Sequence, residues 1–434
     1  MSHERKVRFH TLGCKLNFSE TSTLARQFEE GGFVRTGSDA DADIFVINSC
    51  SVTAHADKKC RSLVHRLHRI RPEAIIAVTG CYAQLRPEEV ASVEGVDLVF
   101  GNNYKGELYE TVAALAGKKE AAAVYSCDTD QLTDFFAAFS SGDRTRAFLK
   151  VQDGCDYKCA YCTIPYARGG SRNIPVAQAV DEARRIAASG QQEIVITGIN
   201  TGDFGRTTGE RFIDLLRALD AVEGISRYRI SSIEPNLLTD EVIGFTAGSE
   251  KFQPHFHIPL QSGCDSVLAR MRRRYTTARF AERIEAVRRA MPDAFIGIDV
   301  IAGFPGESDA DFETTYRFLE KVAPAYLHIF PYSVRPGTPA AGFEGKVPPQ
   351  VVAGRTERLA GLCCRLHRDF SLRYIGGETT VLFESTCRGG MMSGFTENYL
   401  KVLVPYRKTL VNTLCRVSLD TLDDAGNIRG SVLD

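Results

Sequence analysis

Three stretches in the first part of the chain share one pattern, a short apolar run that ends in a small residue and a cysteine. They are KVRFHTLGC, ADIFVINSC and AIIAVTGC, and helical or loop segments separate them. Strands that alternate with helices in this way predict βαβ units and a parallel sheet. Because the carboxyl ends of parallel strands lie along one edge, where open α/β folds bind ligands, Cys14, Cys50 and Cys81 should converge there.

A second α/β segment follows a weaker region. Between residues 118 and 143 the strand and helix signals fade, which predicts a linker. Beyond it, six strand-like runs alternate mostly with helical stretches, which predicts an open, partial (β/α)6 barrel rather than a complete eight-unit one. The runs are FLKVQDG, EIVITGI, RYRISSI, HFHIPL, FIGIDVIAGF and YLHIFPY.

The last part of the chain loses the helical period. GETTVLFES, YLKVLVP and TLCRVSLDTL are short strand patterns joined by turns, which predict a small all-β barrel of a kind that often binds oligonucleotides. A simple structural cap fits the same pattern equally well. The predicted organisation is therefore an α/β parallel-sheet domain (4–117), a linker (118–143), a partial barrel (144–371) and a C-terminal all-β domain (372–434).

Composition limits the cellular setting and the partners. The net charge of −1 over 434 residues gives no general argument for RNA binding, so any RNA contact must come from local patches. No apolar run reaches the roughly 18 residues needed to cross a bilayer, which predicts a cytoplasmic protein with no membrane partner. In a reducing compartment, spaced cysteines among the 13 present bind metal more often than they form disulfides. Seven lack ligand-like spacing and are predicted to be small buried hydrophobes: Cys60, Cys127, Cys264, Cys363, Cys364, Cys387 and Cys415.

The tightest cysteine cluster, GCDYKCAYC, directly follows the first strand of the predicted barrel. Its thiols, Cys155, Cys159 and Cys162, can hold three irons of a [4Fe–4S] cluster and leave the fourth iron free. A free iron can bind the amino and carboxylate groups of S-adenosylmethionine. Structural zinc fits less well, because no nearby cysteine supplies the fourth ligand that zinc requires.

This CxxxCxxC spacing at the end of the first barrel strand resembles the radical S-adenosylmethionine superfamily, and Tyr161 matches the aromatic residue usual before its last cysteine. The resemblance implies that the cluster reduces S-adenosylmethionine and that later strand ends contact it. Some of these polar residues could equally be satisfied strand-end groups. The glycines of GIDVIAGFPGE suit adenine packing, and no Lys-Ser or Lys-Thr follows them as a phosphate loop requires. The candidate cofactor contacts are Tyr161, Gly198, Asn200, Ser232, Glu234, Gln261 and Gly303.

The motifs around the first three cysteines, TLGCKLN, INSCSV and TGCYAQ, resemble the auxiliary-cluster domain of the methylthiotransferases. The order of that domain, the radical barrel and a TRAM-like RNA-binding β-domain also matches. The resemblance implies a second [4Fe–4S] cluster on Cys14, Cys50 and Cys81. It also implies two uses of S-adenosylmethionine, as methyl donor and as radical source, and an unidentified electron donor.

The branches of this family act on threonylcarbamoyl-adenosine in tRNA, on isopentenyl-adenosine in tRNA, or on an aspartate of a ribosomal protein. Lys15 and the Ala-Asp-Lys run at 56–58 most resemble the first branch. That resemblance implies methylthiolation at carbon 2 of N6-threonylcarbamoyladenosine at position 37, within the anticodon stem-loop. The alternatives are the two sister branches or, in a different class, a two-cluster electron carrier or iron–sulfur scaffold with no substrate of its own.

Two basic clusters could support RNA binding. Residues 57–71 contain six Lys or Arg against one Asp, and a second group comprises Arg270, Arg272, Arg273 and Arg274. Either group could instead form a solvated helix face. Arg168, close to the predicted radical cluster, either aligns substrate or orders the site, and the sequence does not decide between these roles or indicate an oligomeric state.

Overall fold

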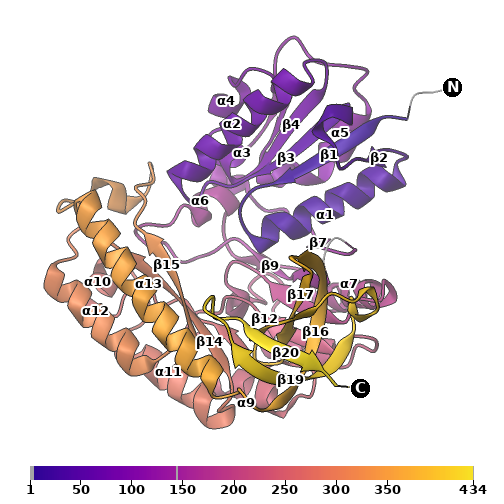
Figure 1. The fold of residues 1–434 in the computed structure, drawn as a ribbon. Helices are drawn as coiled ribbons and strands as arrows, with labels where there is room; N and C mark the ends of the chain where they lie inside the picture. Colours follow the sequence, from indigo (N-terminus) through magenta and orange to yellow (C-terminus); the bar gives the residue numbers. More distant parts are fainter. Residues whose placement is uncertain (1–3, 143–144, 434) are drawn as a thin grey trace.

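The computed structural model describes residues 4–142 and 145–433, and it consists of a parallel-sheet unit, an open β/α barrel and a small β-barrel (Figure 1). The predicted α/β fold with a C-terminal β-barrel is confirmed. The predicted boundary between residues 143 and 144, and residue 434 at the predicted chain end, lie outside the described residues. The remaining domain limits stay predictions.

The N-terminal unit is a six-stranded parallel sheet with strand order β2-β1-β3-β4-β5-β6. Its strands are β1 (Lys6–Thr11), β2 (Val34–Arg35), β3 (Ile44–Ser49), β4 (Ile75–Gly80), β5 (Leu98–Phe100) and β6 (Ala123–Tyr125). Its helices are α1 (Lys15–Glu30), α2 (Ala54–Ile70), α3 (Cys81–Leu85), α4 (Pro87–Ala91) and α5 (Leu108–Ala113). The three cysteine-terminated runs of the sequence are β1, β3 and β4, which are neighbours in this sheet.

Helices cover both faces of this sheet because successive strand residues point to opposite sides. Ile44 and Val46 of β3 join a core formed with α1 and α5, whereas Phe45 and Ile47 join one formed with α2, α3 and α4. A strand buried on both faces needs a continuous apolar run, which is what the first half of β3 supplies.

The region predicted to be a linker contributes to both neighbouring sheets. Strand β6 (Ala123–Tyr125) pairs in parallel with β5, and β7 (Ala138–Phe139) pairs antiparallel with the first barrel strand. Short strands of two or three residues give too little periodicity to be recognised in a sequence.

The middle of the chain forms six consecutive β/α units that curve into an open barrel. Their strands are β8 (Arg146–Lys150), β11 (Glu193–Thr197), β12 (Arg227–Ile230), β13 (His255–His257), β14 (Phe295–Ala302) and β15 (Tyr326–Pro331). The strands form two sheets, one ending at β12 and the other beginning at β13. Isolated bridges from Tyr228 to Phe252 and from Ser232 to His257 connect the two sheets. The covering helices are α7 (Val176–Ala188), α8 (Phe212–Asp220), α9 (Asp240–Gly248), α10 (Asp265–Arg270), α11 (Thr277–Ala290), α12 (Asp309–Val322) and α13 (Pro349–Leu372). The first loop carries β9 (Gln152–Asp153), α6 (Ile164–Arg168) and β10 (Arg172–Asn173).

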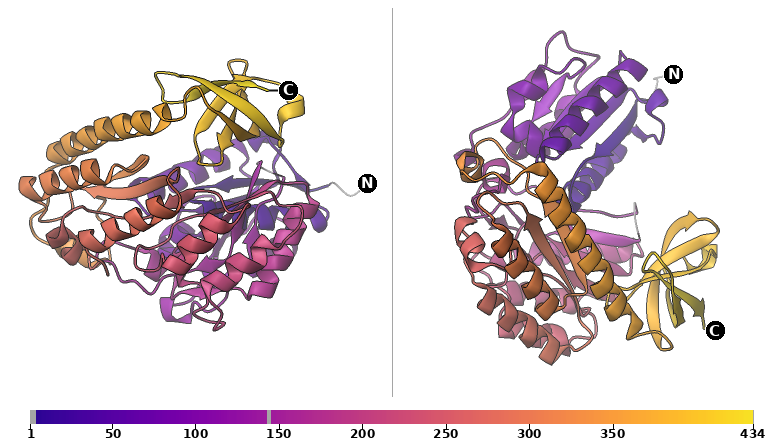
Figure 2. Two further views of the ribbon diagram at one scale, coloured as in Figure 1. Left: turned by 90° about the horizontal axis from the view of Figure 1, so that it is seen from below. Right: turned by 60° about the vertical axis from the view of Figure 1, so that its left-hand side comes forward.

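The C-terminal unit is a closed five-stranded barrel with strand order β16-β17-β18-β20-β19. Its strands are β16 (Glu378–Arg388), β17 (Met391–Thr396), β18 (Lys401–Pro405), β19 (Leu414–Leu422) and β20 (Ile428–Val432). Figure 2 shows this barrel at the far end of the long helix α13, while the N-terminal sheet lies over the mouth of the β/α barrel. Within residues 4–142 and 145–433, no helix is long and apolar enough to cross a membrane.

Candidate active site between two cysteine triads

A cavity of about 390 Å³ lies where the N-terminal sheet meets the mouth of the β/α barrel. Cys155, Cys159 and Cys162 line it from the loop after β8, and Cys14 lines it from the start of α1. The backbone fixes the barrel loop, because Cys155 N–H donates to the Gly169 carbonyl at 3.0 Å. One cavity therefore receives thiols from both predicted triads.

The three N-terminal cysteines meet at the carboxyl edge of the first sheet. Cys50 and Cys81 are buried behind Cys14, and the three thiols are close enough to interact electrostatically. Gly13 has a φ of +100°, and a Cβ there would lie 2.6 Å from the Cβ of Cys50. Only glycine permits this close approach, which brings the Cys14 loop onto the end of β3.

Six of the seven candidate cofactor residues line the same cavity. Asn200 is 2% exposed, and its side-chain Nδ2 and Oδ1 have no hydrogen-bond partner in the described part of the chain. Gln261 adopts a left-handed φ of 71°, a conformation that costs free energy in a non-glycine residue and is concentrated at functional sites. The six residues are Tyr161, Gly198, Asn200, Ser232, Glu234 and Gln261.

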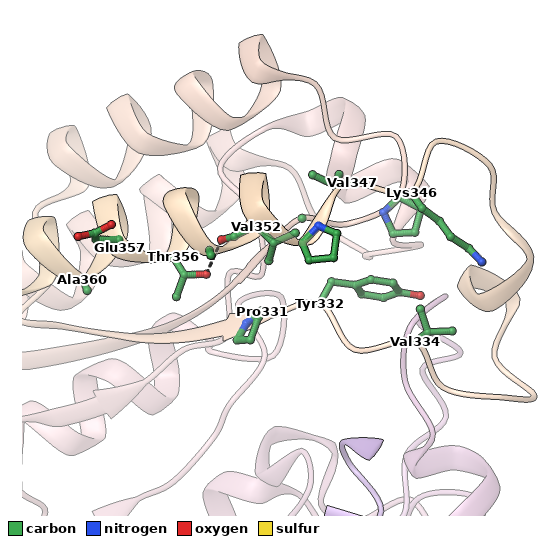
Figure 3. Close-up of a pocket in the computed structure, with 13 residues that line it drawn as sticks. Pro331, Tyr332, Val334, Lys346, Val347, Val352, Thr356, Glu357 and Ala360 are labelled. Carbon is green, nitrogen blue, oxygen red and sulfur yellow. Dashed lines mark hydrogen bonds between the residues drawn. The ribbon is translucent and has the colours of Figure 1, made fainter. Parts of the chain in front are cut away.

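Gly303, the seventh candidate, lines a neighbouring apolar cavity of about 800 Å³ instead. Figure 3 shows that cavity between Val352 and Thr356 of α13 and the Pro331–Tyr332 segment at the end of β15. A Cβ at Gly303 would lie 2.4 Å from Val352 Cγ2, so this glycine admits the close passage of α13. No local sequence pattern indicated that α13 packs against Gly303.

Two further residues line the cavity, Arg273 and Asp299, and His257 lies directly behind it, although the sequence did not indicate any of the three as site residues. Arg273, placed in a basic cluster from the sequence, lines the cavity, forms an ion pair with Glu234 and donates to Cys159 Sγ at 3.1 Å. His257 links Ser232 Oγ and Asp299 Oδ1, each at 2.7 Å. His257 is the last residue of β13, so strand-end position could have indicated it. Asp299 lies inside β14 and Arg273 follows α10, and neither position offered such a signal.

A buried ionic network joins the N-terminal sheet to the radical loop. Glu20 of α1 contacts Lys105 at 2.5 Å, Lys150 at 2.8 Å and Arg168 at 3.0 Å, and each of these side chains is about 1% exposed. Arg168 also pairs with Asp153 at 3.0 Å. Burial alone would raise the pKa of Glu20, but the three cations outweigh it and hold that pKa well below its usual range.

Arg168 belongs to this network and contacts both cysteine-bearing loops. Its Nη2 donates to Asn17 Oδ1 at 2.7 Å, and Asn17 in turn donates to the carbonyls of Leu12 and Ser49. The carbonyl of Ala167 accepts a bond of 2.6 Å from Asn102 in the N-terminal unit. Arg168 therefore orders the joint between the two cysteine-bearing loops.

Replacing Glu20 by Gln should destabilise the protein strongly, because Lys105, Lys150 and Arg168 would lose their shared buried counter-charge. Breaking a buried ion pair in this way costs about 3–5 kcal/mol. Chemical denaturation of cluster-free protein, followed by far-UV circular dichroism, would measure the loss. Glu313→Gln is the matched control, since Glu313 pairs with Arg358 on the surface and its loss should change stability little. Equal effects from both variants would contradict a structural role for the Glu20 network.

The remaining basic residues and cysteines divide between surface and interior. Lys58, Lys59 and Arg69 of α2 are exposed, whereas Cys60 on the same helix is buried as predicted. Among the other cysteines outside the triads, Cys264 and Cys363 are buried and Cys127 and Cys415 are partly exposed. Cys364 and Cys387 are exposed, so burial was the wrong prediction for these two; they lie on the outer faces of α13 and β16.

An open β/α barrel with three cysteines on the loop after its first strand places the chain among the radical S-adenosylmethionine proteins. Residues 149–319 match the radical SAM superfamily, and residues 6–101 match the family described as "Uncharacterized protein family UPF0004". A solved structure of the radical S-adenosylmethionine methyltransferase TsrM from Kitasatospora setae has the same general fold, with a TM-score of 0.56 and 13% identity. The similarity covers 90% of this chain and 81% of that one.

Sequence comparison then identifies the family. The chain is 38% identical to the threonylcarbamoyladenosine tRNA methylthiotransferase MtaB of Bacillus subtilis, over 95% of this chain and 93% of that protein. It is 32% identical to the tRNA-2-methylthio-N(6)-dimethylallyladenosine synthase of Geobacter sulfurreducens, over 100% of this chain and 98% of that protein. The chain belongs to the radical SAM methylthiotransferase family and is an enzyme of that class.

Proposed function

We propose that the enzyme adds a methylthio group to carbon 2 of N6-threonylcarbamoyladenosine next to the anticodon of tRNA. The observation that carries the proposal is that Cys14 and the triad Cys155, Cys159 and Cys162 line one cavity. A reaction that joins sulfur to an unactivated carbon needs both centres within reach of one substrate atom. The substrate assignment is supported by the Bacillus subtilis relative, which carries that substrate in its name.

The residues present fit two iron–sulfur clusters and S-adenosylmethionine. Each triad offers three thiols, which suits a four-iron cluster with one iron open to a further ligand. Burial raises the pKa of Cys50, Cys155 and Cys162 to about 12, so without metal these thiols are protonated at neutral pH. Metal binding must therefore release protons from both triads. When bound, the clusters and S-adenosylmethionine supply the one-electron and sulfur chemistry that no side chain provides.

The protein's own residues would position that chemistry. Asn200 has buried polar atoms without partners in the described chain, and a bound amino-acid group could satisfy them. Arg273 holds Glu234, and His257 holds Ser232, so both polar groups present a fixed orientation toward the cavity. Tyr161 borders the cavity beside Cys162 and packs edge-on against Phe304.

The exposed cations of α2 and the C-terminal β-barrel would bind the anticodon stem-loop. Contacts to RNA phosphates need solvent-exposed cations, and Lys58 and Lys59 of α2 are exposed. The target base must leave its stack to reach the cavity, because carbon 2 is enclosed by neighbouring bases in a structured loop.

Substrate choice tests the proposal. Enzyme with both clusters, offered anticodon stem-loops that carry either threonylcarbamoyl-adenosine or isopentenyl-adenosine, should methylthiolate the first about 100-fold faster or more. A pocket with polar groups rejects an apolar analogue, since its own donors would be left unpaired. Mass spectrometry of the digested nucleosides gives the rates. Equal rates, or a preference for the isopentenyl form, would assign the enzyme to the sister branch.

A further inference from the structure

A second recess of about 260 Å³ lies at the junction of all three structural units, and Cys14 lines both it and the active-site cavity. Lys15 borders it from the N-terminal unit, Arg146, Arg229 and His255 from the strands of the β/α barrel, and Tyr399 from the C-terminal barrel. Any group that enters this recess is therefore adjacent to a substrate held beside Cys14.

The charges around the recess do not balance. Arg146 pairs with Glu384 at 2.9 Å, and Arg229 pairs with Glu193 at 2.8 Å. The side-chain ammonium of Lys15, by contrast, has no hydrogen-bond or ion-pair partner within residues 4–142 and 145–433. The carboxylate that influences it, Asp299, is already hydrogen-bonded to His257. One positive charge in the recess is left without a counter-ion.

The neighbouring aromatic residues show the effect of this positive charge. Burial alone would raise the pKa of Tyr399, but Arg146, Lys15 and Arg229 outweigh it and lower that pKa. Burial, Arg229 and Lys15 together hold the pKa of His255 well below its usual range, so its ring is neutral and keeps one N–H.

His255 provides a second, independent sign of a ligand. It is 8% exposed, and its Nδ1 has no hydrogen-bond partner in the described chain. Buried polar atoms are nearly always paired, so an unpaired one that borders a recess indicates a site that a ligand completes. In addition, α1 begins at Lys15 without a side-chain cap, and the positive end of its dipole favours an anion at the same place.

We propose that this recess binds the carboxylate of the substrate's threonylcarbamoyl group, with Lys15 as its counter-ion and His255 as a neutral donor; the inference rests on the proposed function. The modified base would lie in the cavity beside Cys14, and its substituent would extend past Cys14 toward Lys15. An isopentenyl group carries no charge and would leave Lys15 and His255 unpaired. The recess is thus a specificity-determining element, and Lys15 binds substrate without reacting.

The decisive experiment changes the ligand and the protein together. Anticodon stem-loops would carry threonylcarbamoyl-adenosine either as the free acid or as the neutral carboxamide, and cluster-loaded enzyme would be wild type, Lys15→Met or Lys15→Arg. Wild type should bind the amide about 10- to 100-fold more weakly than the acid, the range for losing one charge-assisted contact. Lys15→Met should lose the same factor on the acid and almost nothing on the amide, whereas Lys15→Arg should recover part of it.

Dissociation constants come from fluorescence anisotropy of labelled RNA without S-adenosylmethionine, and KM and kcat from turnover. Lys58→Met is the matched control, because this exposed cation of α2 should affect acid and amide equally. Iron content of each variant reports whether the cluster beside Cys14 is intact. Equal binding of acid and amide by wild type, or equal losses for both in Lys15→Met, would overturn the inference. A wild-type enzyme that modifies neither carbamoyl form would instead overturn the proposed function.

Discussion

Replacing Cys155, Cys159 and Cys162 together by Ala should abolish the formation of deoxyadenosine from S-adenosylmethionine and remove about half of the bound iron and sulfide. Each triad is expected to hold one four-iron cluster, so the loss of one leaves the other. The two triads lie on different elements, the loop after β8 and the carboxyl edge of the N-terminal sheet, so Ala at the first triad leaves the thiols of the second in place. Iron analysis and chromatography of the small-molecule products measure both effects.

A control with the same number of lost thiols separates this effect from general damage. Cys364, Cys387 and Cys415 lie outside both triads, and the first two are exposed, so their triple Ala variant should keep its iron and its activity. Unchanged iron content together with retained cleavage in the Cys155, Cys159 and Cys162 variant would show that the radical centre lies elsewhere. Loss of all iron would show instead that the two clusters assemble cooperatively.

The sequence predicted those parts of the site that depend on strand order. Cys14, Cys50 and Cys81 are far apart in the chain, yet they had to converge because β1, β3 and β4 are parallel and end at one edge. Asn200 and Gln261 were likewise predicted as strand-end residues of the barrel, and both line the cavity. Periodicity identifies strands, and strand direction then places their ends.

Features that depend on contacts between units were not predictable in the same way. Arg168 and Glu20 are 148 residues apart, and no local pattern indicates that they form a buried pair. Arg273 stands in a run of arginines, which is typical of a solvent-exposed surface. In the fold, however, its side chain is buried and forms an ion pair with Glu234. Gly303 was predicted to contact the cofactor because glycine permits close backbone approach, and that contact stays a prediction. Its close approach to Val352, on a helix that begins 46 residues later, could not be predicted from the local sequence.

Replacing Cys14, Cys50 and Cys81 together by Ala should give the opposite phenotype to the radical-triad variant. S-adenosylmethionine should still be cleaved, because the loop after β8 and its three thiols are unchanged, but no methylthio group should reach the RNA. Iron should again fall by about half. Cys50 and Cys81 are buried, so the variant loses some packing, and far-UV circular dichroism must show a folded protein before activity is compared.

The two triple variants together test the shared cavity rather than either cluster alone. If both centres act on one substrate atom, mixing the two variants should not restore methylthio transfer, because the cleavage site and the sulfur-bearing site would then be on different molecules. Mass spectrometry of tRNA nucleosides after incubation with the mixture measures this. Restored transfer would mean that the sulfur can be delivered between molecules. If the Cys14, Cys50 and Cys81 variant modified tRNA on its own, the sulfur would not pass through this sheet edge. The inference that the cysteines at the ends of β1, β3 and β4 hold the sulfur-supplying cluster would then be wrong.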